Sequence, residues 1–102
     1  MSTVIVRYRT KPERADENQR LVEKVFAELA ERRPAGFRYV TLRLEDGNSF
    51  VHIVSEEPTE DATPLTDIVA FQEFLRGIAD RCEEQPGPTG ATVVGDYRVF
   101  TD

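Results

Sequence analysis

The most constraining feature of the sequence is a hairpin pattern in its middle, FRYVTLRLEDGNSFVHIVS. Two runs rich in β-branched and aromatic residues flank Asp46-Gly47-Asn48, and these three residue types tolerate the positive φ angles of tight turns. A two-residue loop at residues 46–47 would pair Leu42 with Val51, whereas a loop one residue later would pair Leu42 with Ile53. Both registers leave the same side chains together on each face, because strand residues alternate between faces.

The two faces of this hairpin differ in chemistry. One is aliphatic, and the other mixes aromatic and polar side chains. We expect the aliphatic face to pack against helices, since an apolar helix stripe needs an apolar surface to cover it. The aliphatic face comprises Val40, Leu42, Leu44, Val51 and Ile53, and the mixed face comprises Tyr39, Thr41, Arg43, Phe50, His52 and Val54.

The segments around the hairpin supply two more strands and two helices. Residues 3–9 alternate apolar and polar side chains, which predicts a strand. A helix is expected to begin at Pro12 or about a turn later, at Asp16, and to run to about Arg33. A second helix is expected over residues 67–84, ended by EQPGPTG, and a last strand over residues 91–100.

The order strand, helix, strand, strand, helix, strand predicts an α+β, ferredoxin-like βαββαβ fold. Right-handed crossovers place both helices on one face of a four-stranded antiparallel sheet. The chain is short enough to form a single domain over residues 1–102. We expect Val4 and Val6 to lie under the helices with the aliphatic face, and Ile5 and Arg7 to lie on the other face. Ile5, Arg7 and the mixed face of the hairpin form the expected open face, which is the sheet face away from the helices. The last strand adds Val94, Asp96, Arg98 and Phe100 to it.

The expected open face is too apolar to meet water and too polar for an ordinary core. Two copies of the sheet packed face to face would cover it, which predicts a homodimer, a dimeric α+β barrel. Arg7, Arg43 and Arg98 would each cost several kcal/mol if buried without a partner. We therefore expect the dimer to enclose a partly polar cavity in which these arginines meet water, a carboxylate such as Asp96, or an anionic ligand.

The net charge, the apolar runs and the few cysteine and histidine residues limit the classes of partner, the location and the cofactors that we expect. The net charge of −6 argues against nucleic acid, because phosphate binding requires a basic surface. No apolar run is long enough for a signal peptide or a membrane span, and the single Cys82 can form no intrachain disulfide, so the expected location is the cytoplasm. Cys82 falls on the apolar stripe of the second predicted helix, which indicates a buried, inert thiol. One histidine and one distant cysteine offer no metal-ligand spacing, and we expect no metal or cofactor.

Three segments carry a resemblance to a known family: KPERADENQRLVEKVFAEL, RPAGFRYVTLRLEDGNSFVHIV and TPLTDIVAFQEFLRGIADRC. Together they resemble small proteins of the dimeric α+β barrel superfamily that are related to the antibiotic biosynthesis monooxygenase domain. The resemblance implies a homodimer, with any active-site cavity between sheet and helices. Haem-degrading members use a helical histidine and a nearby tryptophan, and this chain has neither. The quinol oxygenases of the superfamily use polar groups and a tryptophan at their site. Without a tryptophan, this chain could form only a partial analogue of that site from Arg43, Tyr39 and His52.

Three functions remain open from the sequence. The first is a cofactor-independent monooxygenase acting on an aromatic or quinol-like metabolite, in which His52 is the base and Arg43 stabilises a phenolate. The second is a non-catalytic protein that binds a small molecule in the same cavity. The third is a dimer without such a site, in which the mixed face is only an interface. For His52, a structural or hydrogen-bonded role is the alternative to catalysis. The expected ligand contacts are Tyr39, Thr41, Phe50, Val54, Arg7 and Phe71.

Overall fold

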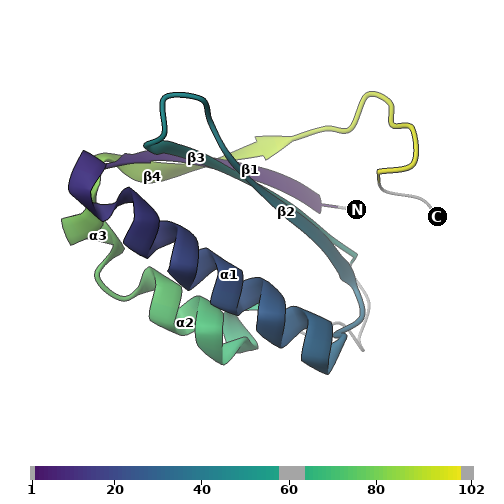
Figure 1. The fold of residues 1–102 in the computed structure, drawn as a ribbon. Helices are drawn as coiled ribbons and strands as arrows, with labels where there is room; N and C mark the ends of the chain where they lie inside the picture. The colour runs from purple at the N-terminus through teal and green to yellow at the C-terminus, as the bar shows by residue number, and fades with distance from the viewer. Residues whose placement is uncertain (1, 58–63, 100–102) are drawn as a thin grey trace.

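The computed structural model describes residues 2–57 and 64–99. Its strands β1 (Ser2–Thr10), β2 (Phe37–Arg43), β3 (Ser49–Glu56) and β4 (Cys82–Ala91) form one antiparallel sheet in the order β2-β3-β1-β4. Helices α1 (Ala15–Arg32) and α2 (Val69–Leu75) lie side by side on the same face of the sheet (Figure 1). This arrangement confirms the predicted ferredoxin-like fold.

The hairpin between β2 and β3 adopts the first of the two predicted registers. Leu42 pairs with Val51 and Thr41 with His52, as a loop at residues 46–47 requires. Gly47 takes a φ of +82°, a conformation that glycine adopts without steric cost. The Asp46 carboxylate accepts hydrogen bonds from the backbone N–H groups of Asn48 and Ser49, so the turn holds its own shape.

The prediction of which hairpin face meets the helices is wrong. The mixed face is the buried one, with His52 only 5% exposed, whereas Val40 and Leu42 on the aliphatic face are 41% and 46% exposed. Strand β1 was predicted correctly, because Val6 lies opposite His52 and faces the helices with it. Aromatic rings bury large areas and their polar atoms find partners here, so the mixed face makes a satisfactory core.

The predicted last strand is also wrong in its position. Strand β4 spans Cys82–Ala91 and contains Pro86 and Pro88, which belong to the segment EQPGPTG that was predicted to end the second helix. The strand lies at the edge of the sheet and bonds only to β1, and its register with β1 shifts between Arg7 and Arg9. Proline is tolerated on edge strands and at bulges because fewer backbone N–H groups are needed there. Residues 92–98 form no strand, and Phe100 lies outside the described residues.

The predicted second helix is divided into shorter pieces. A 3₁₀ turn (Leu65–Asp67) and α2 are followed by α3 (Ile78–Arg81), because Gly77 takes a left-handed φ of +79° between them. Cys82 therefore begins β4 instead of lying on a helix, although its thiol is buried as expected. At the other helix, a 3₁₀ turn at Pro12–Arg14 precedes α1, whose start at Ala15 agrees with the later predicted start.

The core lies between the sheet and the helices and is rich in aromatic rings. Tyr8 stacks on Phe50 with ring centroids 5.6 Å apart, and Phe74 of α2 lies 6.2 Å from Tyr8. Val25 of α1 and Ile68 close the space between the layers. Among the helices within residues 2–57 and 64–99, none has the length and apolar character to cross a membrane.

Candidate functional site

His52 stands at the centre of the buried face and is held at both ring nitrogens. Its Nε2 lies 2.7 Å from the Tyr8 hydroxyl, and its Nδ1 lies 2.6 Å from the Tyr39 hydroxyl and 3.1 Å from that of Thr41. The Phe74 ring lies 5.3 Å from the imidazole. Burial lowers the pKa of His52 to about 4, because the apolar surroundings disfavour the charged ring. His52 is therefore neutral at pH 7.

A small cavity of about 110 Å³ borders the His52 ring between the sheet and α2. Its walls are almost entirely apolar, and Tyr39 and His52 are the two lining residues that have polar side-chain atoms. Sites for drug-sized ligands enclose roughly 300–1,000 Å³, so this cavity by itself fits only a small group. It is lined by Val6, Tyr39, His52, Val54, Leu65, Phe71, Phe74 and Leu75.

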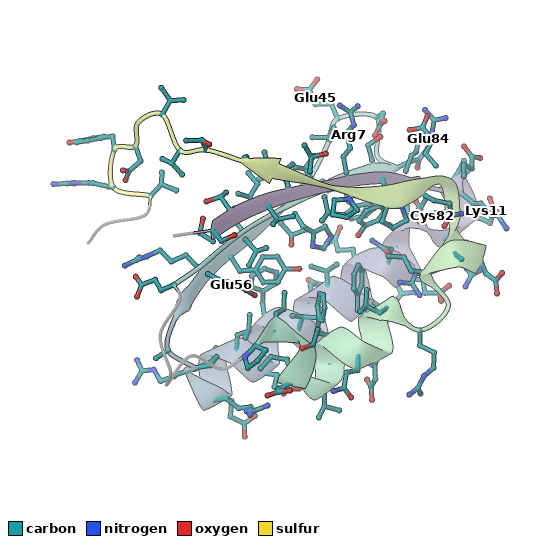
Figure 2. The ribbon with its side chains drawn as sticks, turned by 180° about the vertical axis from the view of Figure 1, so that it is seen from behind. Arg7, Lys11, Glu45, Glu56, Cys82 and Glu84 are labelled. Atoms are coloured by element: carbon teal, nitrogen blue, oxygen red, sulfur yellow. The ribbon has the colours of Figure 1, made fainter. Side chains whose placement is uncertain are left out.

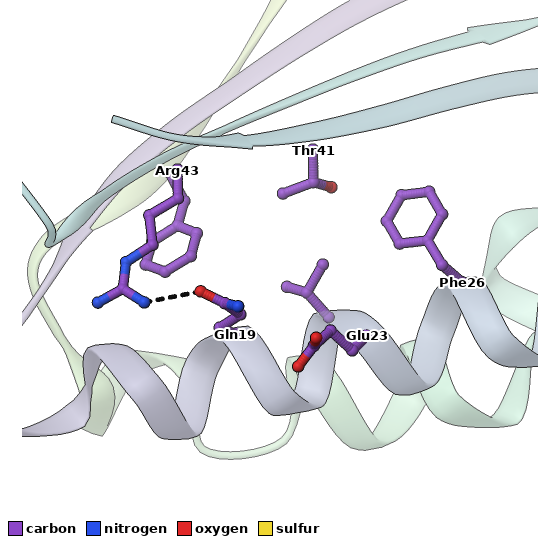
Figure 3. Close-up of a pocket in the computed structure, with 7 residues that line it drawn as sticks. Gln19, Glu23, Phe26, Thr41 and Arg43 are labelled. Atoms are coloured by element: carbon purple, nitrogen blue, oxygen red, sulfur yellow. Dashed lines mark hydrogen bonds between the residues drawn. The ribbon is translucent and has the colours of Figure 1, made fainter. Parts of the chain in front are cut away.

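A larger pocket of about 390 Å³ opens between α1 and β2 (Figure 3). Val22, Phe26 and Phe50 give it apolar walls. Gln19 and Glu23 of α1 and Thr41 and Arg43 of β2 add polar groups to the same lining. Thr41 connects the two spaces, because its hydroxyl is hydrogen-bonded to His52 while its side chain lines the larger pocket. The larger pocket has the volume and the mixed lining of a small-molecule site.

Arg43 is positioned firmly at the rim of the larger pocket. Its guanidinium donates hydrogen bonds to Gln19 Oε1 at 2.7 Å, to Asp16 Oδ1 at 3.2 Å and to the Gly47 carbonyl at 2.8 Å. The same group lies 5.6 Å from the Phe50 ring centroid, within cation–π range. A fixed cation beside an aromatic wall suits a ligand that carries a negative oxygen on a flat ring.

The structure brings together most of the predicted site residues. Tyr39 and Thr41 touch His52 directly, and the remaining ligand contacts divide between the two spaces: Phe50 lines the larger pocket, and Val54 and Phe71 line the small cavity. Arg43 shares the buried face but opens onto the larger pocket and makes its contacts with Gln19, Asp16 and Gly47.

Arg7 is the predicted contact that the fold separates from the others. It lies opposite Val51 in β1, and its side chain projects from the sheet face away from the helices (Figure 2). Because successive strand residues alternate between faces, Arg7 is on the far side of the sheet from Val6 and His52. Its role as a ligand contact stays a prediction that this geometry does not support.

Three residues of the site were not predicted from the sequence: Tyr8, Asn18 and Arg81. Asn18 donates from Nδ2 to the Tyr8 hydroxyl at 2.9 Å, and Arg81 donates from Nε to Asn18 Oδ1 at 3.1 Å. A signal was present, since Asn18 stands one turn before Val22 on the apolar stripe of α1. A polar residue on an apolar stripe must find a buried partner, and that need is a sign of a hydrogen-bonded network.

Both tyrosines of this network stay protonated. Burial raises the pKa of Tyr39 to about 12 and raises that of Tyr8 further. Burial also lowers the pKa of the Arg81 guanidinium, but arginine remains charged in proteins. The site therefore holds two neutral phenols, a neutral imidazole and one buried cation at neutral pH.

Comparisons with known proteins identify the fold. No family model matches the sequence, and no curated protein matches it. A structure described as an antibiotic biosynthesis monooxygenase superimposes with a TM-score of 0.67 at 20% identity, covering 93% of this chain and 100% of that chain. Rv0793 from Mycobacterium tuberculosis gives 0.70 at 14% identity, covering 93% and 96%. A variant of SnoaB, a cofactor-independent oxygenase from Streptomyces nogalater, gives 0.63 at 21% identity, covering 95% and 96%.

These likenesses extend over nearly the whole of each chain. At such low identity they establish the shared fold and leave the chemistry to the residues of each protein. The chain thus has the ferredoxin-like α+β fold of the antibiotic biosynthesis monooxygenase-like proteins, as the resemblance in its sequence implied.

Proposed function

We propose that this protein binds a small aromatic or quinol-like metabolite in the pocket between α1 and β2. The observation that carries the proposal is the pairing of apolar walls with a fixed cation in one space of about 390 Å³. Phe26 and Phe50 offer apolar walls for a flat ring, and Arg43 offers hydrogen-bond donors to an oxygen anion. Asp16, which now accepts one of those bonds, is largely exposed and can yield its place to a ligand.

We further propose that the protein works as a homodimer that pairs through the open face of its sheet. That face carries apolar side chains on three strands, with Val40 and Leu42 each more than two-fifths exposed. An exposed, largely apolar sheet face of this kind is characteristic of an interface. The face comprises Ile5, Arg7, Val40, Leu42, Val51 and Ile53. A second copy supplies a matching surface, because two sheets stack about 10 Å apart with interlocking side chains.

Cofactor-independent oxygenation is the second candidate, and the Arg43 guanidinium beside the Phe50 ring favours it, because a fixed cation there can stabilise the anion of a phenol. In such a reaction the anion of a phenol or quinol gives an electron to O₂, and the two radicals combine at a ring carbon that carries a hydrogen. The peroxide takes up the proton that the substrate lost, its O–O bond breaks, and the outer oxygen leaves as water with the hydrogen of the carbon, so that a carbonyl remains. The substrate supplies all the electrons, so no cofactor takes part. SnoaB, which shares the fold, is described as an oxygenase of this kind. The protein's task would be to hold the anion and exclude water.

The predicted base role of His52 is the least supported part of that candidate. A group with a pKa of about 4 is a weak base at neutral pH, and both nitrogens already have partners. Stabilisation of the anion by Arg43 requires no proton transfer to the protein, because a fraction of the molecules of an activated phenol or anthrone is already ionised in water. Oxygenation would then depend on Arg43 more than on His52.

Isothermal titration calorimetry with a panel of hydroxylated naphthalenes and anthrones tests the binding proposal. We expect Arg43→Gln to weaken binding of the tightest ligand at least tenfold, since one charge-assisted hydrogen bond contributes about 1.5 kcal/mol or more. Arg9→Gln is the matched control, because Arg9 forms ion pairs with Glu83 and Glu84 outside the pocket. Equal affinities of the two variants, or no binding across the panel, would refute the proposal.

Oxygen consumption separates the two candidates. The same ligands are incubated with the protein in an oxygen electrode, and the products are identified by mass spectrometry. A protein that binds but leaves the ligand unchanged is a binding protein. Uptake above background that Arg43→Gln removes and Arg9→Gln preserves would establish oxygenation.

A further inference from the structure

The polar network around His52 begins at a buried cation. Arg81 is 2% exposed, and its guanidinium donates to the carbonyls of Phe74 and Arg76 and to Asn18 Oδ1. Among the residues that the structure describes, no carboxylate lies within ion-pair distance of it. Because arginine has only donor hydrogens, every group that meets it must present an acceptor.

Arg81 therefore fixes the orientation of the Asn18 amide. Oδ1 must face Arg81 Nε, 3.1 Å away, because the amide nitrogen in that place would set two donors against each other. The Asn18 Nδ2 group then points at the Tyr8 hydroxyl oxygen, 2.9 Å away, and donates to it. A side chain that could be turned either way in isolation has only one allowed orientation here.

The donor-to-acceptor direction of the hydrogen bonds continues from Tyr8 to His52. The Tyr8 oxygen accepts from Asn18, so its single hydrogen is free to donate to His52 Nε2 at 2.7 Å. Nε2 must then carry a lone pair. A neutral imidazole has one ring hydrogen, which is therefore on Nδ1. The Nδ1–H group donates to the Tyr39 oxygen at 2.6 Å and lies 3.1 Å from that of Thr41.

The hydrogen-bond network ends at the hydroxyl groups of Tyr39 and Thr41, whose hydrogens are not taken by His52. Neither Tyr39 nor Thr41 can donate to Nδ1, because that nitrogen already carries a hydrogen. One of the two hydroxyls can donate to the other, which leaves at least one hydrogen for a molecule in the adjoining space. Tyr39 lines the small cavity, and Thr41 lines the larger pocket.

We propose that Arg81 and Asn18 are positioning residues that hold His52 in its Nδ1–H form, so that Tyr39 and Thr41 offer hydrogen-bond donors to a ligand. The class of ligand that this arrangement selects carries an acceptor oxygen, a carbonyl or a phenolate, in place of a donor. The opposite direction would let Tyr39 or Thr41 donate to His52 and would open a route for His52 to accept a proton through them. The direction of the network thus decides whether Tyr39 and Thr41 donate hydrogen bonds to a ligand or whether His52 can act as a base.

Nitrogen-15 NMR tests the direction without any ligand. The chain has one histidine, so its imidazole signals need no assignment among several. We expect the wild-type protein at pH 7 to show a protonated Nδ1 and an unprotonated Nε2. Asn18→Asp replaces the Nδ2 donor with an acceptor, so Tyr8 donates to the new carboxylate and its oxygen accepts from Nε2. The hydrogen should then move to Nε2.

Asn48→Asp is the matched control, because it makes the same chemical change in the hairpin turn, away from the network, and should leave the imidazole signals unchanged. Tyr8→Phe is the second variant in case Asn18→Asp does not fold. It removes the donor to Nε2, and we expect a mixture of the two imidazole forms. A wild-type protein with its hydrogen on Nε2, or imidazole signals unaltered in the folded variants, would overturn the proposed direction.

The ligand class rests on the proposed function and needs its own measurement. A pair of ligands with and without the acceptor oxygen, such as naphthoquinone and naphthalene, is titrated into wild type, Tyr39→Phe and Thr41→Val. We expect wild type to prefer the quinone and at least one variant to lose most of that preference. If the NMR result holds and neither ligand binds, the proposed function fails while the direction stands. If naphthalene binds as tightly as naphthoquinone, the donor site is disproved.

Discussion

The two faces of the sheet differ in a way that hydrophobicity alone would not suggest. The face under the helices carries a histidine, tyrosines and a threonine, while the open face carries mainly valine, leucine and isoleucine, with Arg7 beside them. Polar side chains are buried without loss when each has a partner, and His52, Tyr8 and Tyr39 all do. The contrast teaches that the buried face is the one whose groups satisfy one another, and it leaves the aliphatic face available for the proposed dimer.

The largest expected effect comes from removing the cation that anchors the buried face. Arg81→Met leaves the Phe74 and Arg76 carbonyls and Asn18 Oδ1 without a donor, and each unsatisfied buried group costs about 1–3 kcal/mol. We expect the free energy of unfolding to fall by at least about 3 kcal/mol in urea denaturation. Arg76→Met, an exposed change in the same segment, should shift it by no more than about 0.5 kcal/mol. Similar losses in both variants would mean that the buried face does not depend on satisfying its polar groups.

The next effect is a loss of stability in mild acid that originates in His52. Its folded pKa of about 4 lies below the unfolded value, so the unfolded chain binds the proton first. His52 does not reduce the stability above about pH 6.5, and stability is lost as the pH falls toward 4; by pH 5 the loss amounts to about 2 kcal/mol. Denaturation curves at pH 7.5 and pH 5 measure it.

His52→Gln is the control for this loss, because glutamine can keep a hydrogen bond to a tyrosine but does not titrate. The variant should be less stable at pH 7.5 and should change much less between the two pH values. The carboxyl groups of Asp46 and Glu28 have lowered pKa values and affect both proteins alike. An equal acid loss in wild type and His52→Gln would contradict the burial of a neutral imidazole.

The smallest effect on the fold itself is expected on the open face. Leu42→Glu places a charge where the side chain is already 46% exposed, so the monomer should change by no more than about 0.5 kcal/mol. The proposed dimer should dissociate, because two carboxylates would be buried at its interface. Light scattering on a sizing column measures the mass. Val69→Glu, an exposed change on α2, should leave the dimer intact, and a monomeric wild-type protein would remove the proposed interface.

Much of the candidate site could be predicted because its members lie on one hairpin. Turn chemistry and alternation are local, so they placed Tyr39, Thr41 and His52 on one face and left two registers open, of which the structure has the one that pairs Thr41 with His52. Asn18 and Arg81 were missed because they are separated by 63 positions and meet only when α1 and α3 pack. No local pattern records which distant group will satisfy a buried amide.

The position of β4 marks a second limit. Pro86 and Pro88 are poor strand residues in isolation, so local propensity assigned this segment to the end of the second helix and favoured the valine-rich residues that follow. An edge strand with one neighbour accepts prolines, and whether a segment lies at an edge depends on the order of the whole sheet. The same global order left Val94 and Tyr97 exposed beyond the strand.

The sequence by itself determined the order of the elements, the ferredoxin-like fold and the two sets of hairpin residues that each share a face. These follow from periodicity and turn residues, which act over a few positions. Only the tertiary structure decided which hairpin face is buried, because that choice depends on the pairing of β3 with β1 and on partners that α1 and α3 bring from elsewhere. Burial of a polar group depends on its hydrogen-bond partners, and those partners are assembled by folding.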